Sequence, residues 1–196
     1  GKMKLKVNME KTEARSAVGS SFLGFTFLTL KGDDGRLGYC RPKQKKLDAF
    51  TKKIREILKR NRGVSIQRIV AELNAYLRGW INYYARSNIT SWLRSKASWI
   101  RRKIWCYLYK QWMTKGNRIA KLREMGSSER WIRGWGYTLG IQSYWKMSGV
   151  IASSLPVGKF YMVTGLIDIE ATYKRLHAER MMMDKCHGKQ LEFVFD

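Results

Sequence analysis

The sequence is poor in cysteine and in acidic residues, and it has no long apolar run. Its three cysteines, Cys40, Cys106 and Cys186, are odd in number and widely spaced, which argues against a disulfide framework and indicates a reducing compartment. Charged residues interrupt every apolar stretch before it reaches the roughly 18 residues that a membrane span requires. The start, Gly1 to Lys6, does not resemble a signal peptide. We therefore expect a cytoplasmic chain without a membrane partner.

Motifs of the common catalytic and nucleotide sites are also missing. The chain has no P-loop, no dinucleotide-binding glycine motif, no G-x-S-x-G and no C-x-x-C. His177 and His187 lack the two further ligands at suitable spacing that structural zinc needs. Gly32-Asp33-Asp34 has the form of a polymerase metal-binding turn, but no suitable carboxylate precedes it and no hydrophobic strand follows, so we interpret it as a hairpin turn. These absences describe a binding domain and predict no metal site in this chain.

What the sequence has in excess is positive charge. There are 39 Lys and Arg against 15 Asp and Glu, which gives a formal net charge of +24 and a pI near 10.3. No carboxylate lies between Glu72 and Glu124, whereas lysine, arginine and tryptophan recur throughout that segment. A solvated helix face normally mixes charge signs to gain i,i+4 pairs. The segment therefore predicts contact with a polyanion, and nucleic acid is the first hypothesis.

The pattern of apolar residues predicts a small antiparallel sheet followed by helices. Strand-like residues extend over 4–30, and 31–35 is a hairpin turn before a return strand at 37–40. Helical spacing then predicts three long helices: one with Leu47 to Leu58 on its apolar face that Gly63 ends, one over 66–84 that Ser65 caps, and one over about 90–113 that a hydroxyl residue caps.

Shorter elements follow the three helices. We predict helices over 117–125, 128–137 and 168–180, leave 138–165 unassigned, and note that Leu191 to Phe195 could pair as a strand. The expected fold is mainly α: a basic three-helix bundle, preceded by a small antiparallel β hairpin or sheet and followed by short helices. Its expected divisions are a β segment at 1–42, the three-helix domain at 43–116, an extension at 117–180 and a tail at 181–196.

The tryptophans of the third helix have two interpretations. They could stack on unpaired bases or fill the core, and their helical spacing favours the core. Trp92 and Trp99 lie on one side of the helix, whereas Trp105 and Trp112 lie toward another. We therefore expect at least one of the four to be exposed.

Several of these segments together resemble bacterial group II intron reverse transcriptase/maturases, over roughly residues 4 to 176. The resemblance rests on Lys6 to Thr12, on Phe22-Leu23-Gly24-Phe25, on Arg41-Pro42 and above all on the helix Leu73 to Tyr84, with its Leu-x-x-Trp-x-Asn-Tyr-Tyr pattern. Lys121 to Gly126 and Gly140 to Met147 resemble the closing segment of that family. Here Ser143-Tyr144-Trp145-Lys146-Met147 stands in place of a Gly-Tyr-Trp-Arg-Ile-like stretch.

The resemblance implies the last palm strands at 1–42 and the thumb, or maturase-specific X domain, at 43–116. It implies structured RNA as partner, most directly the group II intron, with help in intron folding and splicing and a grip on the template-primer duplex. The family's Tyr-Ala-Asp-Asp motif would lie upstream of residue 4, so we expect no polymerase activity from this chain alone. Any Mg²⁺ would belong to that missing site or to the RNA.

Two alternative functions stay open. The chain could be a subunit of a split RNA-directed DNA polymerase that pairs with a separate fingers and palm chain. It could also be a scaffold that binds acidic proteins.

Twelve basic residues are the expected phosphate contacts. They are Arg41, Lys43, Lys45, Lys46, Arg60 and Arg62 near the first helix, and Arg78, Arg101, Arg102, Lys103, Lys110 and Arg118 farther along. Reversal of Arg101 and Arg102 to Glu is expected to reduce RNA affinity without unfolding the chain.

Overall fold

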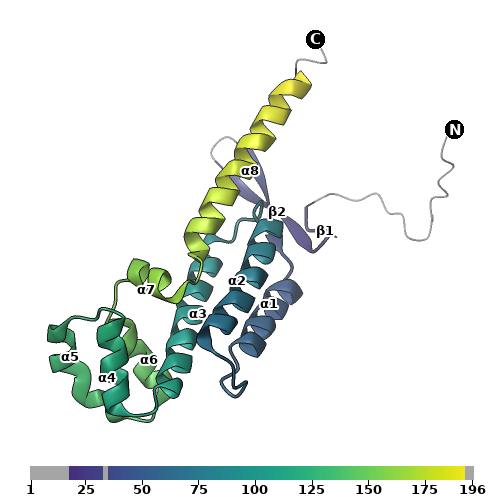
Figure 1. Cartoon of the computed structure of the whole chain (residues 1–196). Helices are drawn as coiled ribbons and strands as arrows, with labels where there is room; N and C mark the ends of the chain where they lie inside the picture. Colours follow the sequence, from purple (N-terminus) through teal and green to yellow (C-terminus); the bar gives the residue numbers. More distant parts are fainter. Residues whose placement is uncertain (1–17, 33–34, 193–196) are drawn as a thin grey trace.

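The computed structural model of the chain describes residues 18–32 and 35–192 and is mainly helical (Figure 1). Its elements are β1 (Ser21–Phe22), β2 (Phe25–Gly32), β3 (Gly35–Pro42), α1 (Gln44–Ile57), α2 (Ile66–Tyr83), α3 (Thr90–Gln111), α4 (Lys115–Glu124), α5 (Glu129–Trp135), the 3-10 helix η1 (Gly136–Gly140), α6 (Tyr144–Ala152), α7 (Val157–Thr164) and α8 (Ile169–Glu192). This order confirms the expected fold class. Within the described ranges no helix is both long enough and apolar enough to cross a bilayer.

The strands form one antiparallel sheet in the order β1-β2-β3. The register pairs Thr26 with Arg41 and Gly32 with Gly35, which confirms the predicted hairpin. Asp33 and Asp34 at its tip, and the part of the first predicted strand before residue 18, lie outside the described residues. Gly24 has φ +85° between β1 and β2, and a Cβ there would lie 3.1 Å from the Tyr84 hydroxyl. The turn therefore requires glycine for its conformation and for its close approach to α2.

The three long helices begin and end close to the predicted positions, with two corrections. Ser65 caps α2 as expected, because its hydroxyl accepts from the amide of Arg68. The first helix ends at Ile57 rather than at Gly63, since the Arg62 guanidinium donates to the Ile57 carbonyl at 2.8 Å and closes the helix end. The predicted hydroxyl cap of α3 is wrong, because Thr90 is already helical and the N-cap is Ile89, a core residue.

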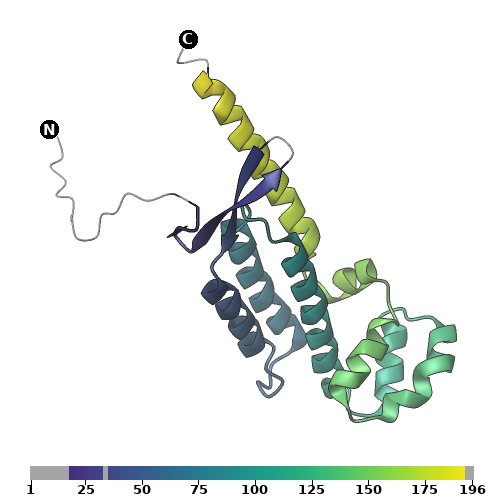
Figure 2. The ribbon, with the colours of Figure 1, turned by 180° about the vertical axis from the view of Figure 1, so that it is seen from behind.

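A second layer covers one end of α3, where α4, α5, η1, α6 and α7 gather (Figures 1 and 2). Helices α4 and α5 match the predictions and begin after Thr114 and Ser128, whose hydroxyls accept from the amides of Asn117 and Trp131. The unassigned segment 138–165 forms most of η1 and all of α6 and α7. Its apolar side chains join those of the long helices in one continuous core.

Helix α8 extends beyond the sequence prediction. It continues through residue 180, the expected boundary of the tail, and reaches Glu192. The predicted strand at its end is therefore wrong for Leu191 and Glu192, while residues 193–196 lie outside the described part. Most residues of 181–192 are strong helix formers such as Met, Lys, Gln, Leu and Glu, which favours continuation of the helix through Gly188. Its C-terminal turns project away from the body (Figures 1 and 2).

The N-terminal half of α8 is fixed to α2 and to the loop that follows it. The Tyr173 hydroxyl donates to the carbonyl of Ser87 and accepts from the amide of Ile89, and the His177 ring donates to the Ala85 carbonyl. Ahead of α8, the Asn74 side chain donates to Gly165 O at 2.8 Å and accepts from Ile167 N at 3.0 Å. These bonds hold the start of α8 in one position against α2.

Removal of the Tyr173 hydroxyl tests this attachment. We expect Tyr173→Phe to lower the free energy of unfolding by about 2 kcal/mol, because the buried Ser87 carbonyl loses its donor. Urea unfolding measures the change. A matched Tyr137→Phe variant, whose side chain is exposed, is expected to leave the free energy of unfolding unchanged. Equal stability of both variants and the parent chain would contradict the role of Tyr173.

Candidate nucleic-acid interface

A row of alternating aromatic and basic side chains lies along one face of α3. Trp92, Lys96, Trp99 and Lys103 follow one another at spacings of four, three and four residues, which places them on one side of a helix with 3.6 residues per turn. The Lys96 ammonium lies 5.6 Å from the centroid of the Trp92 ring and 5.5 Å from that of Trp99. The Lys103 ammonium lies 5.8 Å from the Trp99 centroid. Each lysine is therefore held over an indole ring by a cation-π contact.

Side chains of α6 and of the α1 region extend this row sideways. Arg55 on α1 lies over Trp99 at 5.9 Å, Arg102 lies over Trp145 at 4.0 Å, and Lys103 lies 5.6 Å from the same Trp145 ring. Arg60, just after α1, lies over Tyr144 at 5.2 Å. We name this surface the basic-aromatic band, which consists of Arg55, Arg60, Trp92, Lys96, Trp99, Arg102, Lys103, Tyr144 and Trp145.

The tryptophans of α3 divide between the band and the core, but the expectation that at least one of the four is exposed is wrong, because Trp92 and Trp99 are only half-buried and the other two are buried. Trp105 and Trp112 are buried and pack edge to face, with ring centroids 6.3 Å apart. Trp92 is half-buried, with Phe50 and Trp80 behind it at 5.3 Å and 5.5 Å. Trp99 is also half-buried, and Trp145 is 45% exposed. The band therefore presents aromatic surface that is supported from behind but reaches solvent.

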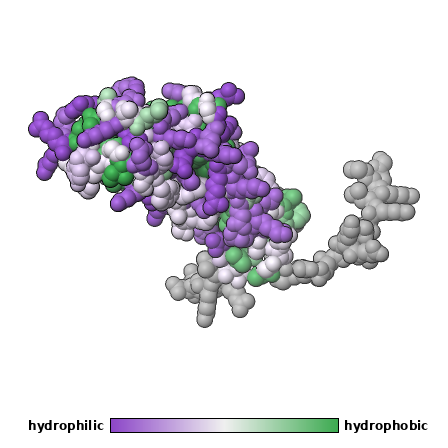
Figure 3. Space-filling view, turned by 90° about the horizontal axis from the view of Figure 1, so that it is seen from below, coloured by the Kyte–Doolittle hydropathy of each residue, from purple (hydrophilic) through white to green (hydrophobic). Residues whose placement is uncertain are grey.

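The basic groups of the band carry no internal counter-charge. In the part of the chain that the structure describes, carboxylates pair with Arg62, Arg94, Arg123 and other residues, but not with Lys96, Arg102 or Lys103. Acidic residues are absent from all of α3, so a carboxylate partner has to come from another element, as Glu170 of α8 does for Arg94. From below, the surface is largely hydrophilic, with small hydrophobic areas between (Figure 3). Unneutralised cations of this kind attract phosphate and release its counterions.

The expected phosphate contacts do not all lie together. Arg60, Arg102 and Lys103 belong to the band, and Lys110 continues its face two turns beyond Lys103. The others are distributed over the sheet side and α2: Arg41, Lys45, Lys46 and Arg78 are exposed, and Lys43 is half-buried. Arg62 is engaged by Glu72 at 2.7 Å and by the end of α1. The residues 101–103 do not share one surface, because successive residues of a helix point about 100° apart: Arg102 and Lys103 belong to the band and Arg101 does not.

Arg101 lies on the other side of α3 from the row. Its guanidinium donates to the Tyr161 hydroxyl at 2.7 Å and lies 5.7 Å from the Tyr161 ring centroid. Arg102 donates to the Trp145 carbonyl at 3.1 Å. Reversal of Arg101 and Arg102 to Glu would therefore break packing contacts as well as charge, so Lys96 and Lys103 provide the cleaner test of the surface.

Arg118 corrects the sequence prediction. It is only 1% exposed, with its guanidinium 3.6 Å from the centroid of the Tyr109 ring. Its Nε donates to the Tyr109 carbonyl at 3.3 Å and its terminal nitrogen to the Leu139 carbonyl at 2.6 Å. Tyr109 lies in the last turn of α3, where carbonyls lack helical partners. Arg118 therefore ties the end of α3 to η1 and is not accessible to a phosphate.

Sequence reasoning missed Arg55, Lys96, Tyr144 and Trp145 as members of the site. Lys96 had a usable signal, because it follows Trp92 by four residues and precedes Trp99 by three. Tyr144 and Trp145 stood out only through the family resemblance at 143–147, and their place in the site depends on α6 packing along α3. Within the described ranges, no three ligand-type side chains gather to hold a metal ion. Cys106 is buried and donates to the Tyr144 carbonyl, so it supports the band from below.

Burial raises the pKa of several tyrosines in the helical core. Loss of solvation is the main cause at Tyr76, Tyr84, Tyr109 and Tyr161, and the cations Arg118 and Arg101 oppose it at the last two. A group whose pKa is raised by folding contributes stability that is complete below its unfolded pKa, about 10 for tyrosine, and is lost above it. We expect the free energy of unfolding to fall as pH rises from 9.5 to 11, measured by urea unfolding at each pH. A constant or rising value would contradict this.

Comparison with known proteins supplies an independent result. Residues 47–126 match the family model of the group II intron, maturase-specific domain. The matched segment contains most of α1 and all of α2, α3 and α4, and hence the row of aromatic and basic residues on α3. No curated protein matches the chain. Residues 47–126 are therefore a group II intron maturase-specific domain, which supports the C-terminal region of a group II intron maturase/reverse transcriptase and a role in group II intron splicing.

Proposed function

We propose that the chain binds structured RNA through the basic-aromatic band, and that the folded group II intron is the RNA it recognises. The observation that carries the proposal is the row Trp92, Lys96, Trp99 and Lys103, in which each lysine is held over an aromatic ring and has no carboxylate partner among the described residues. The maturase-specific domain matches the same helices.

The proposed binding separates positioning from stacking. Lysines and arginines of the band contact phosphates and fix the orientation of the RNA, while the shape of the folded RNA supplies selectivity. Lys96 and Lys103 are seven residues apart, about 10 Å along the helix axis at 1.5 Å per residue. Exposed ring surface of Trp145 offers a platform for an unpaired base. A protein that binds only the folded intron shifts the RNA toward its folded state by mass action.

The same surface also suits a template-primer duplex, because phosphate contacts are independent of sequence. We propose this grip as a second use of the band when a catalytic palm is present. One observation favours such a partner chain: Phe22, in the short edge strand β1, is 66% exposed, and Leu23, in the turn that follows it, is 68% exposed. An apolar edge of this kind is suited to pairing with another chain.

The function is tested by binding the purified chain to a group II intron RNA and to an unrelated RNA duplex of equal length across a salt series. Selective binding of the intron that survives at physiological salt would support the proposal. Equal and steeply salt-dependent binding to both RNAs would reduce the chain to a nonspecific basic module. Preference for an acidic protein over either RNA would favour the scaffold alternative and exclude the proposed function.

The partner-chain alternative has its own test. Co-expression with a polypeptide that carries the fingers, palm and catalytic motif of the family should give a stable complex that copurifies. A Phe22→Lys/Leu23→Lys variant is expected to prevent copurification while RNA binding persists, because these side chains lie outside the band. Failure of the unmodified pair to copurify would exclude the split polymerase.

A further inference from the structure

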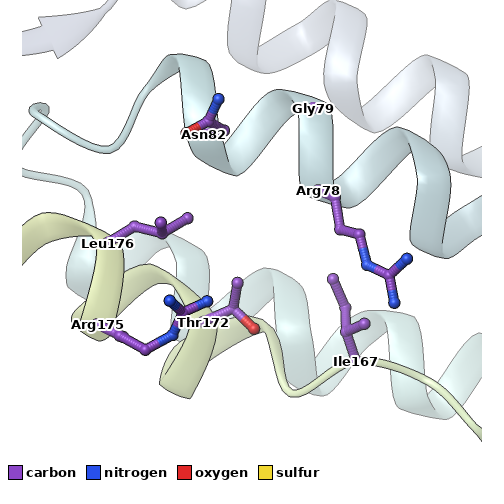
Figure 4. Close-up of a pocket in the computed structure, with 7 residues that line it drawn as sticks. All are labelled: Arg78, Gly79, Asn82, Ile167, Thr172, Arg175 and Leu176. Carbon is purple, nitrogen blue, oxygen red and sulfur yellow. The ribbon is translucent and has the colours of Figure 1, made fainter.

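A cavity of about 580 Å³ lies between α2 and α8, away from the band. Its lining consists of Arg78, Gly79 and Asn82 from α2, Ile167 from the loop before α8, and Thr172, Arg175 and Leu176 from α8. In Figure 4 Arg78 comes from α2 and Arg175 from α8, and they lie at opposite ends of the site with Ile167 and Thr172 between them in the view. The volume is in the range of small-molecule sites and exceeds what a lone phosphate needs.

The cavity is on a different side of the bundle from the band. Tyr76 and Trp80 of α2 pack against Phe50 of α1, and Trp80 reaches Trp92. Arg78 is two residues from each of them, which places it on roughly the opposite side of α2. A ligand in this cavity therefore cannot be the same nucleotide that contacts the band.

The walls of the cavity are fixed before any ligand arrives. Asn74 bonds the loop that carries Ile167 to α2, and Tyr173 and His177 bond α8 to the end of α2. Arg180 donates to the Asn82 side-chain oxygen at 3.2 Å, which leaves the Asn82 amide nitrogen to donate elsewhere. Gly79 leaves the α2 side open, because a Cβ there would meet nothing within 4 Å.

The charge balance around the cavity favours an anion. Arg78 is exposed and forms no ion pair within the described residues, and Arg180 adds a third guanidinium nearby. Two carboxylates lie near the lining residues: Asp168, next to Ile167, accepts from the Ala171 amide at 3.0 Å at the start of α8, and Glu179 pairs with Arg175 at 3.0 Å on the same helix. The Arg175 side chain is 65% exposed and the Glu179 side chain 47%, so water weakens this ion pair and a phosphate can compete with Glu179 for Arg175. Ile167 and Leu176 add an apolar wall suited to a ribose or a base.

We propose that the α2-α8 cavity holds one nucleotide of an RNA strand, with the phosphate between Arg78 and Arg175 and the sugar or base against Ile167, Leu176 and Asn82. This rests on the proposed function, that the chain binds RNA, and adds a second contact on another side of the domain. The RNA then engages two faces of the bundle, so that its fold, and not a single helix, is recognised.

A neutral substitution that fills the cavity is the sharpest test. Gly79→Leu adds a side chain where the structure has open space, removes no charge and raises helix propensity. We expect the thermal midpoint to stay equal or rise and the affinity for group II intron RNA to fall on the order of tenfold, because the phosphate can no longer bond to the arginines. Gly158→Leu on α7, also in open space and outside the cavity, is the matched control. Intron affinity equal to the parent chain would overturn the proposal.

A charge reversal at Arg78 tests the proposal in a second way that does not depend on filling the cavity. Arg78→Glu is expected to reduce the slope of log affinity against log salt by about 0.7 to 0.9, which corresponds to one phosphate that is no longer neutralised. Arg68→Glu, an equal reversal at an exposed position of α2 outside the cavity, should leave the slope closer to that of the parent. Equal effects of the two reversals would show general electrostatics and overturn the assignment.

Two further outcomes separate the sources of failure. If a free nucleoside monophosphate saturates the parent chain without displacing RNA, the cavity takes a small molecule and the proposal fails while RNA binding through the band stands. If the parent chain itself does not bind structured RNA, both proposals fail. Loss of binding in Lys96→Glu/Lys103→Glu, with full binding in Gly79→Leu, would retain the band and reject the cavity.

Discussion

Reversal of Lys96 and Lys103 to Glu in one variant is expected to weaken binding to group II intron RNA about 100-fold at low salt. Both lysines belong to the basic-aromatic band and lie over indole rings without a carboxylate partner among the described residues. A glutamate at each position removes a phosphate ligand and adds repulsion. The measurement is RNA affinity over a salt series, in which the slope of log affinity should fall by about 0.9 for each duplex phosphate that the variant no longer neutralises.

The chain itself should remain folded. Both lysines are half-buried, and each contributes a cation-π contact of about 0.5 to 1 kcal/mol, so the free energy of unfolding should fall by no more than about 2 kcal/mol. Lys115→Glu/Arg130→Glu, two exposed positions at the second helical layer, is the control with the same change in net charge. If this control weakens RNA binding as strongly, total charge and not the band decides affinity.

Replacement of Arg118 by Met is expected to give the largest loss of stability. Methionine retains much of the length but none of the donors, so the Tyr109 and Leu139 carbonyls lose charged hydrogen bonds in a buried place. Such bonds contribute about 1.5 to 3 kcal/mol each, and we expect the free energy of unfolding to fall by about 3 kcal/mol or more. Urea unfolding measures it. Arg68→Met, at an exposed position of α2, should cost little.

The RNA affinity of Arg118→Met distinguishes a structural role from a binding role. At a temperature where the variant is folded, its affinity should equal that of the parent, because the Arg118 side chain is 1% exposed. A variant of normal stability that loses RNA binding would restore Arg118 to the RNA surface, where its charge alone had suggested it.

Local patterns predicted the elements whose signal lies within their own residues. The spacing of Ile69, Leu73 and Leu77 predicts α2, and the hydroxyl of Ser65 fixes its start. The end of α1 was not predictable in this way, because the Arg62 side chain returns to the Ile57 carbonyl. The segment 138–165 lacks a clear period because its short helices bury residues against α3 and against one another.

The candidate site shows the same division. Charge and aromatic spacing on α3 predicted a basic surface with tryptophans on two sides, and the structure leaves Trp92 and Trp99 half-buried on the band and Trp105 in the core. They did not predict which cations are free. The sequence does not distinguish Arg101 from Arg118. In the structure Arg101 donates to the Tyr161 hydroxyl, whereas Arg118 is buried between α3 and η1.

The sequence by itself determined the excess of positive charge, the helical class and the two sides on which the tryptophans of α3 lie, because charge and periodicity are properties of a chain that need no long-range contact. Only the tertiary structure decided which arginines reach solvent, how Trp145 joins the band and that an open cavity lies between α2 and α8. Those outcomes depend on residues far apart in sequence meeting in space. A side chain is free or engaged according to the neighbours that packing brings to it.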